Sequence, residues 1–346
     1  MRAPATKPHS CGVIGVVFQA DARDLASTVR AASVDLAYLD PPFKVEKRFG
    51  ARVGHGERAA GPVAYDDTWR SLDAYLDWLA ARIAVVRETL SPHATMWLHL
   101  DHRAVHEAKI VCDRIFGATR FRGEVIWVPG NGSKSKSGPG IGHQTLLLYA
   151  RGPDPIWNAK DAALRAPFAE TSQAMHFTNV DADGRRYRER VVGSRTYRYY
   201  ADEGRALGSV WMDCPSMSAN TPLRRESTGY PTQKPLKLLD RIVRASSLPG
   251  SLVLDPFCGS GTTLLAAAAA GRRFVGTDIG DLAIATTRAR LDAAGVPYDD
   301  GDPCSFLSSS GSIVSASSSS AAEPSPSGRR STSPTRGPTS RSSRRK

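Results

Sequence analysis

The chain has 346 residues and a net charge of +12, with 46 Lys and Arg against 34 Asp and Glu. This length can bury a full core as one large domain with an insertion, or as two domains. Five scattered cysteines exclude a secreted disulfide scaffold and disfavour a zinc cluster, and no apolar run is long enough to span a membrane. We expect a cytoplasmic protein with a polyanionic partner, most simply nucleic acid.

Strand-like and helix-like segments alternate in the first part of the chain. Ser71 is the expected N-cap of a long amphipathic helix, and Gly117 is the expected end of a second helix. The expected strands are 13–20, 34–39, 95–100, 124–128 and 145–150, and the expected helices are 71–90 and 104–116.

The same alternation returns near the C-terminus. Pro235 suits the first turn of a helix that turns Leu236, Leu239, Ile242 and Val243 inward. The expected strands here are 251–254 and 273–277, and the further helices are 262–270 and 282–294. This pattern predicts an α/β fold with a doubly wound, mostly parallel, Rossmann-like sheet.

Two regions depart from this pattern. Residues 151–225 break the alternation, and Gly184 to Tyr200 interleave basic and aromatic residues without a helical period. We interpret this region as an insertion with a DNA-facing surface, although an ordinary solvated β-hairpin fits as well. Residues 305–346 hold 17 Ser among 42 and a net charge of +6, so we predict a disordered basic tail over 301–346.

The first candidate site is the segment LVLDPFCGSGTT, which predicts a strand, a glycine-bearing turn and a helix N-terminus. Glycines let the backbone approach a ligand, at the carboxyl edge of the sheet. The third glycine of a dinucleotide site and the lysine of a P-loop are both absent. Asp255 disfavours phosphate and suits a cation such as the ammonium or sulfonium of S-adenosylmethionine. Asp278, ending the next strand, can accept both ribose hydroxyls.

The second candidate site is Asp40-Pro41-Pro42-Phe43, at the end of a predicted strand. Two prolines fix the backbone and leave carbonyls free. A carboxylate and a carbonyl can accept both hydrogens of an exocyclic amino group, while the aromatic ring stacks on a planar base. This arrangement favours attack of the amino nitrogen on a sulfonium methyl group, although a plain strand-ending turn has the same sequence.

The two motifs, in this order, resemble the β class of amino-methylating DNA methyltransferases. The similarity extends to Tyr65-Asp66-Asp67 with Trp69, to Ile115-Phe116-Gly117 and to Gly229–Pro235, and it covers residues 11–150 and 180–290. It implies a catalytic half at 11–150, a target recognition insertion at 151–225 and a cofactor half at 226–300. It also implies a bacterial or phage-type, nucleoid-associated enzyme that flips its target base.

The resemblance assigns roles to residues of both motifs. The catalytic residues would be Asp40, Pro41, Pro42 and Phe43. Thr232 and Lys234 would lie near the carboxylate of S-adenosylmethionine, Asp278 near its ribose and Asp21 near its adenine. Its methionine part would be surrounded by Asp255, Phe257, Gly259, Ser260, Gly261, Thr262 and Thr263.

DNA contacts are expected from basic residues in three loops or hairpins. They are Lys44, Lys47, Arg48, Lys134, Lys136, Arg185, Arg186, Arg188, Arg190, Arg195 and Arg198. We favour duplex DNA as substrate and adenine N6 as the methylated atom, in a restriction–modification or marking role. The alternatives are cytosine N4, an RNA or protein-amide substrate, and an idle DNA-binding protein.

No metal site is predicted. His99, His102 and His106 are better explained by a strand end and a surface helix, and Asp101 either lines the base pocket or caps the next helix. A homodimer and a cognate restriction endonuclease are the expected protein partners.

Overall fold

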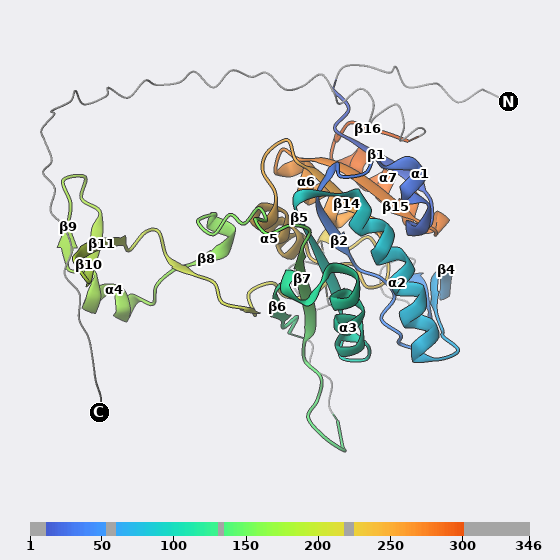
Figure 1. The fold of residues 1–346 in the computed structure, drawn as a ribbon, viewed down its shortest axis with the longest axis horizontal. Helices are drawn as coiled ribbons and strands as arrows, with labels where there is room; N and C mark the ends of the chain where they lie inside the picture. The colour runs from blue at the N-terminus through green and yellow to red at the C-terminus, as the bar shows by residue number, and fades with distance from the viewer. Residues whose placement is uncertain (1–11, 53–59, 131–134, 218–224, 301–346) are drawn as a thin grey trace, which may run out of the picture. The chain divides into compact units, whose positions relative to one another are not determined.

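A computed structural model describes residues 12–52, 60–130, 135–217 and 225–300. Its centre is a nine-stranded sheet with the order β13-β6-β7-β5-β2-β14-β15-β1-β16 (Figure 1). These strands are β1 (Gly15–Gln19), β2 (Val34–Leu39), β5 (Leu90–Leu100), β6 (Phe121–Trp127), β7 (Gln144–Ala150), β13 (Val210–Trp211), β14 (Leu252–Asp255), β15 (Arg273–Asp278) and β16 (Tyr298–Asp299).

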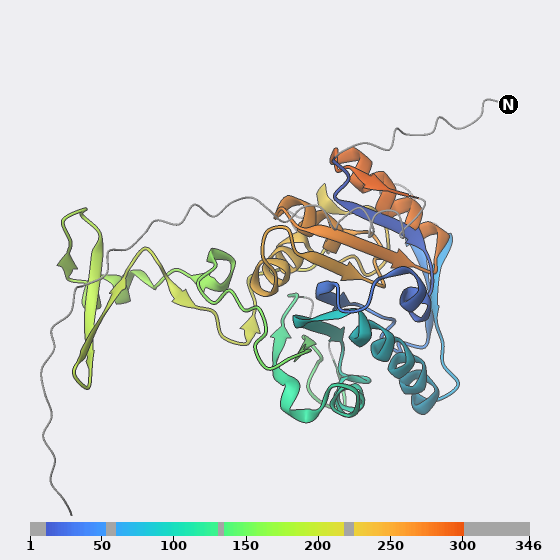
Figure 2. The same ribbon diagram turned by 45° about the horizontal axis from the view of Figure 1, so that its top comes forward.

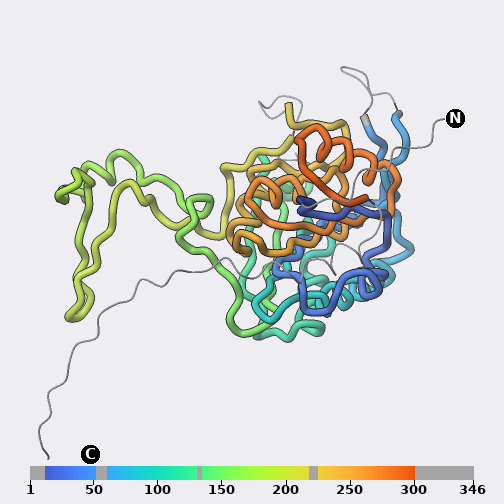
Figure 3. The backbone as a smooth tube through the Cα atoms, turned by 90° about the horizontal axis from the view of Figure 1, so that it is seen from above, coloured from blue at the N-terminus to red at the C-terminus, as the bar shows by residue number. Residues whose placement is uncertain are grey.

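The sheet is mostly parallel. Only β7, among the described strands of this sheet, runs antiparallel to its neighbours β5 and β6. The two ends of the chain interleave, because β2 pairs with β14 and β1 pairs with β15. Figure 3 follows these blue and orange segments as they lie side by side. The predicted doubly wound, mostly parallel sheet is therefore confirmed.

Helices cover both faces of the sheet, as Figure 2 shows. One face packs against α1 (Leu25–Thr28), α2 (Leu72–Thr89) and α3 (Val105–Phe116), and the other against α5 (Leu236–Ser246), α6 (Thr262–Ala269) and α7 (Asp281–Ala293). Strand residues alternate between the two cores: Ala37 and Leu39 face the first, while Leu36 and Tyr38 face the second. This period of two is what a sheet buried on both sides requires.

Smaller elements lie outside the central sheet. A hairpin is formed by β3 (Lys47–Arg52) and β4 (Ala60–Asp67), and β8 (Arg165–Ala166) pairs with β12 (Arg205–Ala206). A separate sheet contains β9 (Asn179–Val180), β10 (Arg186–Val192) and β11 (Arg195–Tyr200), and α4 (Glu170–His176) precedes it. Three single turns of 3₁₀ helix complete the set: η1 (Ala22–Asp24), η2 (Ala118–Arg120) and η3 (Ala162–Leu164).

The predicted insertion contributes one strand to the central sheet. Val210 and Trp211 in β13 pair with Ile126 and Trp127 in β6. The Trp211 ring is buried and contacts Trp97. A two-residue strand has no periodicity of its own, and for this reason the sequence pattern did not reveal it. The division into domains stays a prediction.

Most predicted elements are confirmed, with small shifts at their ends. The Ser71 hydroxyl caps α2 by accepting from Ala74 N, and Gly117 ends α3 with a φ of 92°. Leu90 was expected in the helix, but α2 ends at Thr89 and Leu90 begins β5 opposite Val34. Pro235 is the N-cap of α5, in extended conformation, and does not occupy its first turn. The short helices α1 and α4 were not predicted.

Within the described ranges, no helix is both long enough and apolar enough to cross a bilayer. The predicted tail at 301–346 lies outside the residues that the structure describes.

Candidate functional site

A cavity of about 420 Å³ opens at the carboxyl ends of β2, β14 and β15. β2 leads towards α2 on one face of the sheet, and β14 leads towards α6 on the other, so the connections from these two parallel neighbours diverge to opposite faces. Such a switch point is where open α/β sheets bind ligands. Both predicted motifs line this one cavity, since Asp40 to Phe43 and Asp255 to Gly259 are among its walls.

The Asp40–Phe43 segment is held in place by a buried carboxylate. Asp67 accepts hydrogen bonds from the backbone N of Phe43, Lys44 and Val45, at 2.8–3.1 Å, and from the Trp69 indole at 2.7 Å. Lys44 has a φ of 60°, an unusual value for a residue with a side chain. Asp67 therefore fixes the turn that follows the Asp40–Phe43 motif, a role that the sequence did not reveal.

The Asp40 carboxylate is paired with a lysine from a distant segment. Lys234 Nζ donates to both Asp40 oxygens, at 2.7 and 2.6 Å, and both side chains are largely buried. Burial raises the pKa of Asp40, although the Lys234 charge opposes this effect. Lys234 was expected near a cofactor carboxylate, and in the structure its ammonium contacts the carboxylate of Asp40.

A neutral histidine lies behind Asp40. His99 Nδ1 shares a 2.7 Å hydrogen bond with the Tyr38 hydroxyl and lies 4.0 Å from Asp40 Oδ1. Burial lowers the pKa of His99 well below its usual value, so the imidazole carries no charge. Its ring packs 5.7 Å from that of Phe43. His99 is thus a core residue that supports the motif, and the described residues hold no cluster of three potential metal ligands.

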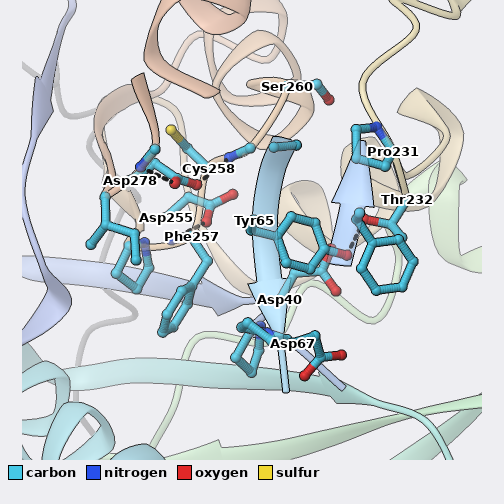
Figure 4. Close-up of a pocket in the computed structure, with 18 of the residues that line it drawn as sticks. Asp40, Tyr65, Asp67, Pro231, Thr232, Asp255, Phe257, Cys258, Ser260 and Asp278 are labelled. Carbon is cyan, nitrogen blue, oxygen red and sulfur yellow. Dashed lines mark hydrogen bonds between the residues drawn. The ribbon is translucent and has the colours of Figure 1, made fainter. Parts of the chain in front are cut away.

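The other end of the cavity contains two carboxylates without a counter-charge. Asp255 accepts from Phe257 N at 3.1 Å, and Asp278 accepts from the N of Gly259 and Gly280 at 3.0 and 2.9 Å. In the described part of the chain, neither forms an ion pair. Burial raises the pKa of Asp255 to about 7 and also raises that of Asp278. Figure 4 shows the two carboxylates close together.

The glycines of this segment are needed by its geometry. Gly261 precedes α6 with a φ of 75°, and a Cβ there would lie 2.8 Å from the Thr287 hydroxyl. Gly259 has a φ of 52°, and its N–H is the donor to Asp278. Cys258 directly precedes Gly259, and burial raises the pKa of its thiol, which disfavours the reactive thiolate form.

The remaining predicted cofactor residues also lie around the cavity. The hydroxyl groups of Thr232 and Tyr65 share a hydrogen bond of 3.1 Å. Asp21 caps η1 through Arg23 N and accepts from Arg82, whose guanidinium stacks 4.0 Å above the Trp78 ring. Phe257, Ser260, Thr262 and Thr263 line the same space. The sequence assigned no role to Arg82 or Tyr230, which are also walls of this cavity.

Asp101 lies elsewhere. Its carboxylate accepts from Arg103 N at 2.9 Å and pairs with the Arg103 side chain. It lines a second hollow with Arg103, His143 and Gln144, outside the cavity that holds Asp40. Neither interpretation is confirmed: Asp101 does not line the cavity of Asp40, and α3 has Ala104 as its N-cap with no side-chain cap, so the Asp101 carboxylate makes only a local turn contact before the helix.

The predicted DNA-contacting residues divide into paired and unpaired groups. Lys44 binds Glu46 and Arg48 binds Asp66, each at 2.7 Å, whereas Lys47 and Lys136 are exposed. Lys134 lies outside the described residues. The arginines belong to the three-stranded sheet and to the turn before it, so the sequence grouped them correctly in space.

The β10–β11 hairpin has two different faces. On one, Arg185 binds Asp202 and stacks on Tyr200, and Arg198 binds Glu189 and stacks on Tyr187. On the other, Arg188 packs against Phe177 and Tyr199, 5.2 and 5.6 Å from their rings. Arg186 donates to the Phe177 carbonyl. Arg190 and Arg195 are exposed, and in the described ranges no carboxylate pairs with either.

Comparison with known proteins places the chain in a family. The sequence profile of the DNA methylase family, which covers N6 and N4 methyltransferases, matches residues 34–288. A type II methyltransferase of Enterobacter cloacae, M.EcaI, is 27% identical over 316 residues, which cover 79% of this chain and 68% of the relative. The DNA adenine methyltransferase YhdJ of Escherichia coli is 28% identical over 279 residues, covering 80% and 83%.

The fold agrees with this assignment. The solved structure of the PvuII DNA methyltransferase, described as cytosine-N4-specific, superposes with a TM-score of 0.52 and 14% identity, over 86% of this chain and 92% of that one. The profile match covers both motifs and the strands that carry them. This chain therefore belongs to the DNA methylase family and is an N6- or N4-amino DNA methyltransferase.

Proposed function

We propose that this protein transfers a methyl group from S-adenosylmethionine to N6 of an adenine in duplex DNA. The observation that carries the proposal is the shared cavity. An acceptor motif for an amino group lies at one end, and two buried carboxylates without cations lie at the other. Such a cavity suits a cationic cofactor and a planar base together.

The cofactor end of the cavity has matching chemistry. An ammonium group would supply the counter-charge that buried Asp255 lacks, and ribose hydroxyls would donate to Asp278. Bound S-adenosylmethionine supplies an electrophilic methyl group on a sulfonium centre. We expect Trp78 and Phe257, which lie 5.8 Å apart as ring centroids, to pack against its apolar parts. Asp21 and Thr232 would complete the binding site, as the resemblance implies.

The base end would hold and polarise the amino group. Tyr75 already donates to the Pro42 carbonyl at 2.8 Å, so within the described chain the Pro41 carbonyl is the second acceptor beside Asp40. Two acceptors draw the amino hydrogens aside and stabilise the positive charge that the nitrogen gains as its bond to the methyl carbon forms. Phe43 would stack on the ring of the base. The target base must be flipped, because its amino group is inaccessible in the helix.

The DNA itself would contact unpaired basic residues. Arg190 and Arg195 on the β10–β11 hairpin, with Lys47 and Lys136, are exposed, and no carboxylate of the described residues forms an ion pair with them. Free guanidinium groups beside exposed Tyr197 suit phosphate or guanine contacts. The paired arginines Arg185 and Arg198 would instead stiffen the hairpin.

Adenine is favoured over cytosine by the D-P-P-F form of the motif and by the similarity to an adenine methyltransferase. Cytosine N4 presents the same exocyclic amino chemistry and is the second candidate, since a relative by fold is cytosine-N4-specific. A homodimer and a cognate restriction endonuclease stay predictions from the family resemblance.

The test is a methylation assay with purified protein, S-adenosylmethionine and unmethylated plasmid DNA. The product is digested to nucleosides and identified by mass spectrometry, with Asp40→Ala as the inactive control. We expect N6-methyladenine with the wild type and a loss on the order of 10³-fold in the variant, since a buried charged acceptor is removed.

The other outcomes are equally informative. N4-methylcytosine would overturn the choice of base alone. The absence of any methylated base on DNA of many sequences, despite cofactor binding, would contradict the DNA activity and direct the assay to RNA and protein substrates.

A further inference from the structure

We propose that Lys234 couples the two halves of the cavity: it holds Asp40 until the carboxylate of the cofactor takes its ammonium group. Lys234 is thus a positioning residue that makes base binding depend on cofactor binding. The inference rests on the proposed function, since it names S-adenosylmethionine and an amino group as the two ligands. Three observations carry it.

First, Lys234 contacts the two groups that the base would bind, the Asp40 carboxylate and the Phe43 ring. Its ammonium donates to both oxygens of Asp40, at 2.7 and 2.6 Å. The same nitrogen lies 4.9 Å from the centre of the Phe43 ring. The acceptor and the stacking surface proposed for the base are therefore both in contact with one side chain.

Second, the pair is chemically unsuited to the methyl transfer. The attacking amino nitrogen gains positive charge as the new bond forms, and Asp40 can stabilise that charge only while its own charge is not cancelled. An ammonium at hydrogen-bonding distance from both carboxylate oxygens opposes this stabilisation, and in a buried site the opposition is strong. Lys234 must therefore leave Asp40 before or during base binding.

Third, Lys234 is confined to the cavity. Its side chain is 8% exposed, so leaving Asp40 without a new partner would place a poorly hydrated charge in the cavity, which is costly. The carboxylate beside this loop, that of Asp67 at the end of β4, is already engaged by three backbone N–H groups and an indole. A carboxylate brought in by the cofactor is the partner that would release Lys234 without leaving a bare charge.

The arrangement also protects the empty enzyme. A buried carboxylate without a partner is costly, and Lys234 stabilises Asp40 before any ligand is bound. The two binding events are then linked, so each must strengthen the other by the same factor.

The test measures binding of S-adenosylhomocysteine by calorimetry at pH 8, with no turnover involved. Asp40→Asn keeps the shape of the side chain but releases the lysine. We expect this variant to bind S-adenosylhomocysteine roughly five- to tenfold more tightly than the wild type, because its carboxylate no longer competes with Asp40 for the ammonium. The matched ligand is 5′-methylthioadenosine, which has no carboxylate, and its affinity should be unchanged.

A double-mutant cycle assigns the effect to Lys234. In a Lys234→Met background, Asp40→Asn should no longer change the affinity for S-adenosylhomocysteine. Equal tightening with and without Lys234 would mean that Asp40 merely repels the ligand, and the inference would be wrong. The comparison of the two ligands on Asp40→Asn needs no lysine variant. An equal gain in affinity for 5′-methylthioadenosine would overturn the inference even where Lys234→Met fails to fold.

The failures of the two proposals can be told apart. A wild-type protein that binds neither ligand would overturn the proposed cofactor, and the inference with it. A wild-type protein that binds both, with Asp40→Asn unchanged for each, would overturn only the role of Lys234.

Discussion

Charged side chains have opposite surroundings in the cavity and in the β10–β11 hairpin. In the hairpin, exposed Arg185 and Arg198 are matched by carboxylates and stacked on tyrosine rings. In the cavity, buried Asp255 and Asp278 have only hydrogen-bond donors, and their pKa values are raised by burial. Exposed pairs contribute little to stability, whereas a buried charge without a counter-charge is costly.

The difference indicates where ligands belong. A buried carboxylate without a counter-charge, such as that of Asp255, lowers the stability of the fold. We take this cost as a sign that the site binds a cationic ligand. By the same logic, Arg190 and Arg195, which no described carboxylate pairs with, are the hairpin arginines that we propose for DNA contacts. Five experiments test this contrast.

The largest effect is expected from Asp255→Asn. The pKa of Asp255 rises from its ordinary 3.8 to about 7 on folding. Between these pH values the folded state therefore binds more protons than the unfolded state. As a result, the free energy of unfolding of the protein falls as the pH rises through that window. At pH 8 the variant should be more stable than the wild type by roughly 2–4 kcal/mol, measured by urea unfolding without ligand.

Asp213→Asn is the control of opposite sign. Hydrogen bonds from Arg241 lower the pKa of Asp213, so this carboxylate stabilises the fold at neutral pH and that contribution is lost as the pH falls. The variant should be less stable than the wild type at pH 8. A loss of stability in both variants would contradict the view of Asp255 as an uncompensated charge.

Asp278→Asn should weaken cofactor binding. The amide keeps an oxygen for Gly259 N but loses the charge that would strengthen hydrogen bonds from ribose hydroxyls. We expect the affinity for S-adenosylhomocysteine to fall roughly 10- to 100-fold by calorimetry. An unchanged affinity would place the ribose elsewhere in the cavity.

Arg190→Gln with Arg195→Gln tests the free face of the hairpin. Removing two phosphate contacts should weaken DNA binding roughly tenfold at moderate salt and reduce the slope of log K against log salt concentration by about 2. Fluorescence anisotropy over a salt series measures both. An unaltered slope would mean that this face does not touch the DNA backbone.

Arg185→Gln with Arg198→Gln is the matched pair on the opposite face and should have the smallest effect. Both arginines serve exposed ion pairs, so the loss of stability should be below about 1 kcal/mol. The salt dependence of DNA binding should match that of the wild type in the same anisotropy series. A large change in the slope would show that the internal pairs open on DNA.

Local sequence patterns predicted most of the helices and strands of the central sheet domain. Ser71 and Gly117 mark helix ends because their side chain or backbone acts on adjacent residues, and the structure confirms both. Strands ending at Leu39 and Asp278 were found because buried β-strands have continuous apolar runs. β13 and α1 were missed, since two-residue strands and single helical turns depend on distant neighbours.

By itself, the sequence determined the doubly wound sheet and the two motifs, because strand period, prolines and glycines act through their own backbone. Only the tertiary structure decided which charges meet. Lys234 lies 194 residues from Asp40 in the sequence, and their side chains pair. Asp67, at the end of another strand, accepts hydrogen bonds from the loop that follows Asp40. Such pairings are set by how strands order themselves in the sheet, and burial then determines what each charge costs. No local sequence pattern specifies the order of the strands or the energetic cost of each buried charge.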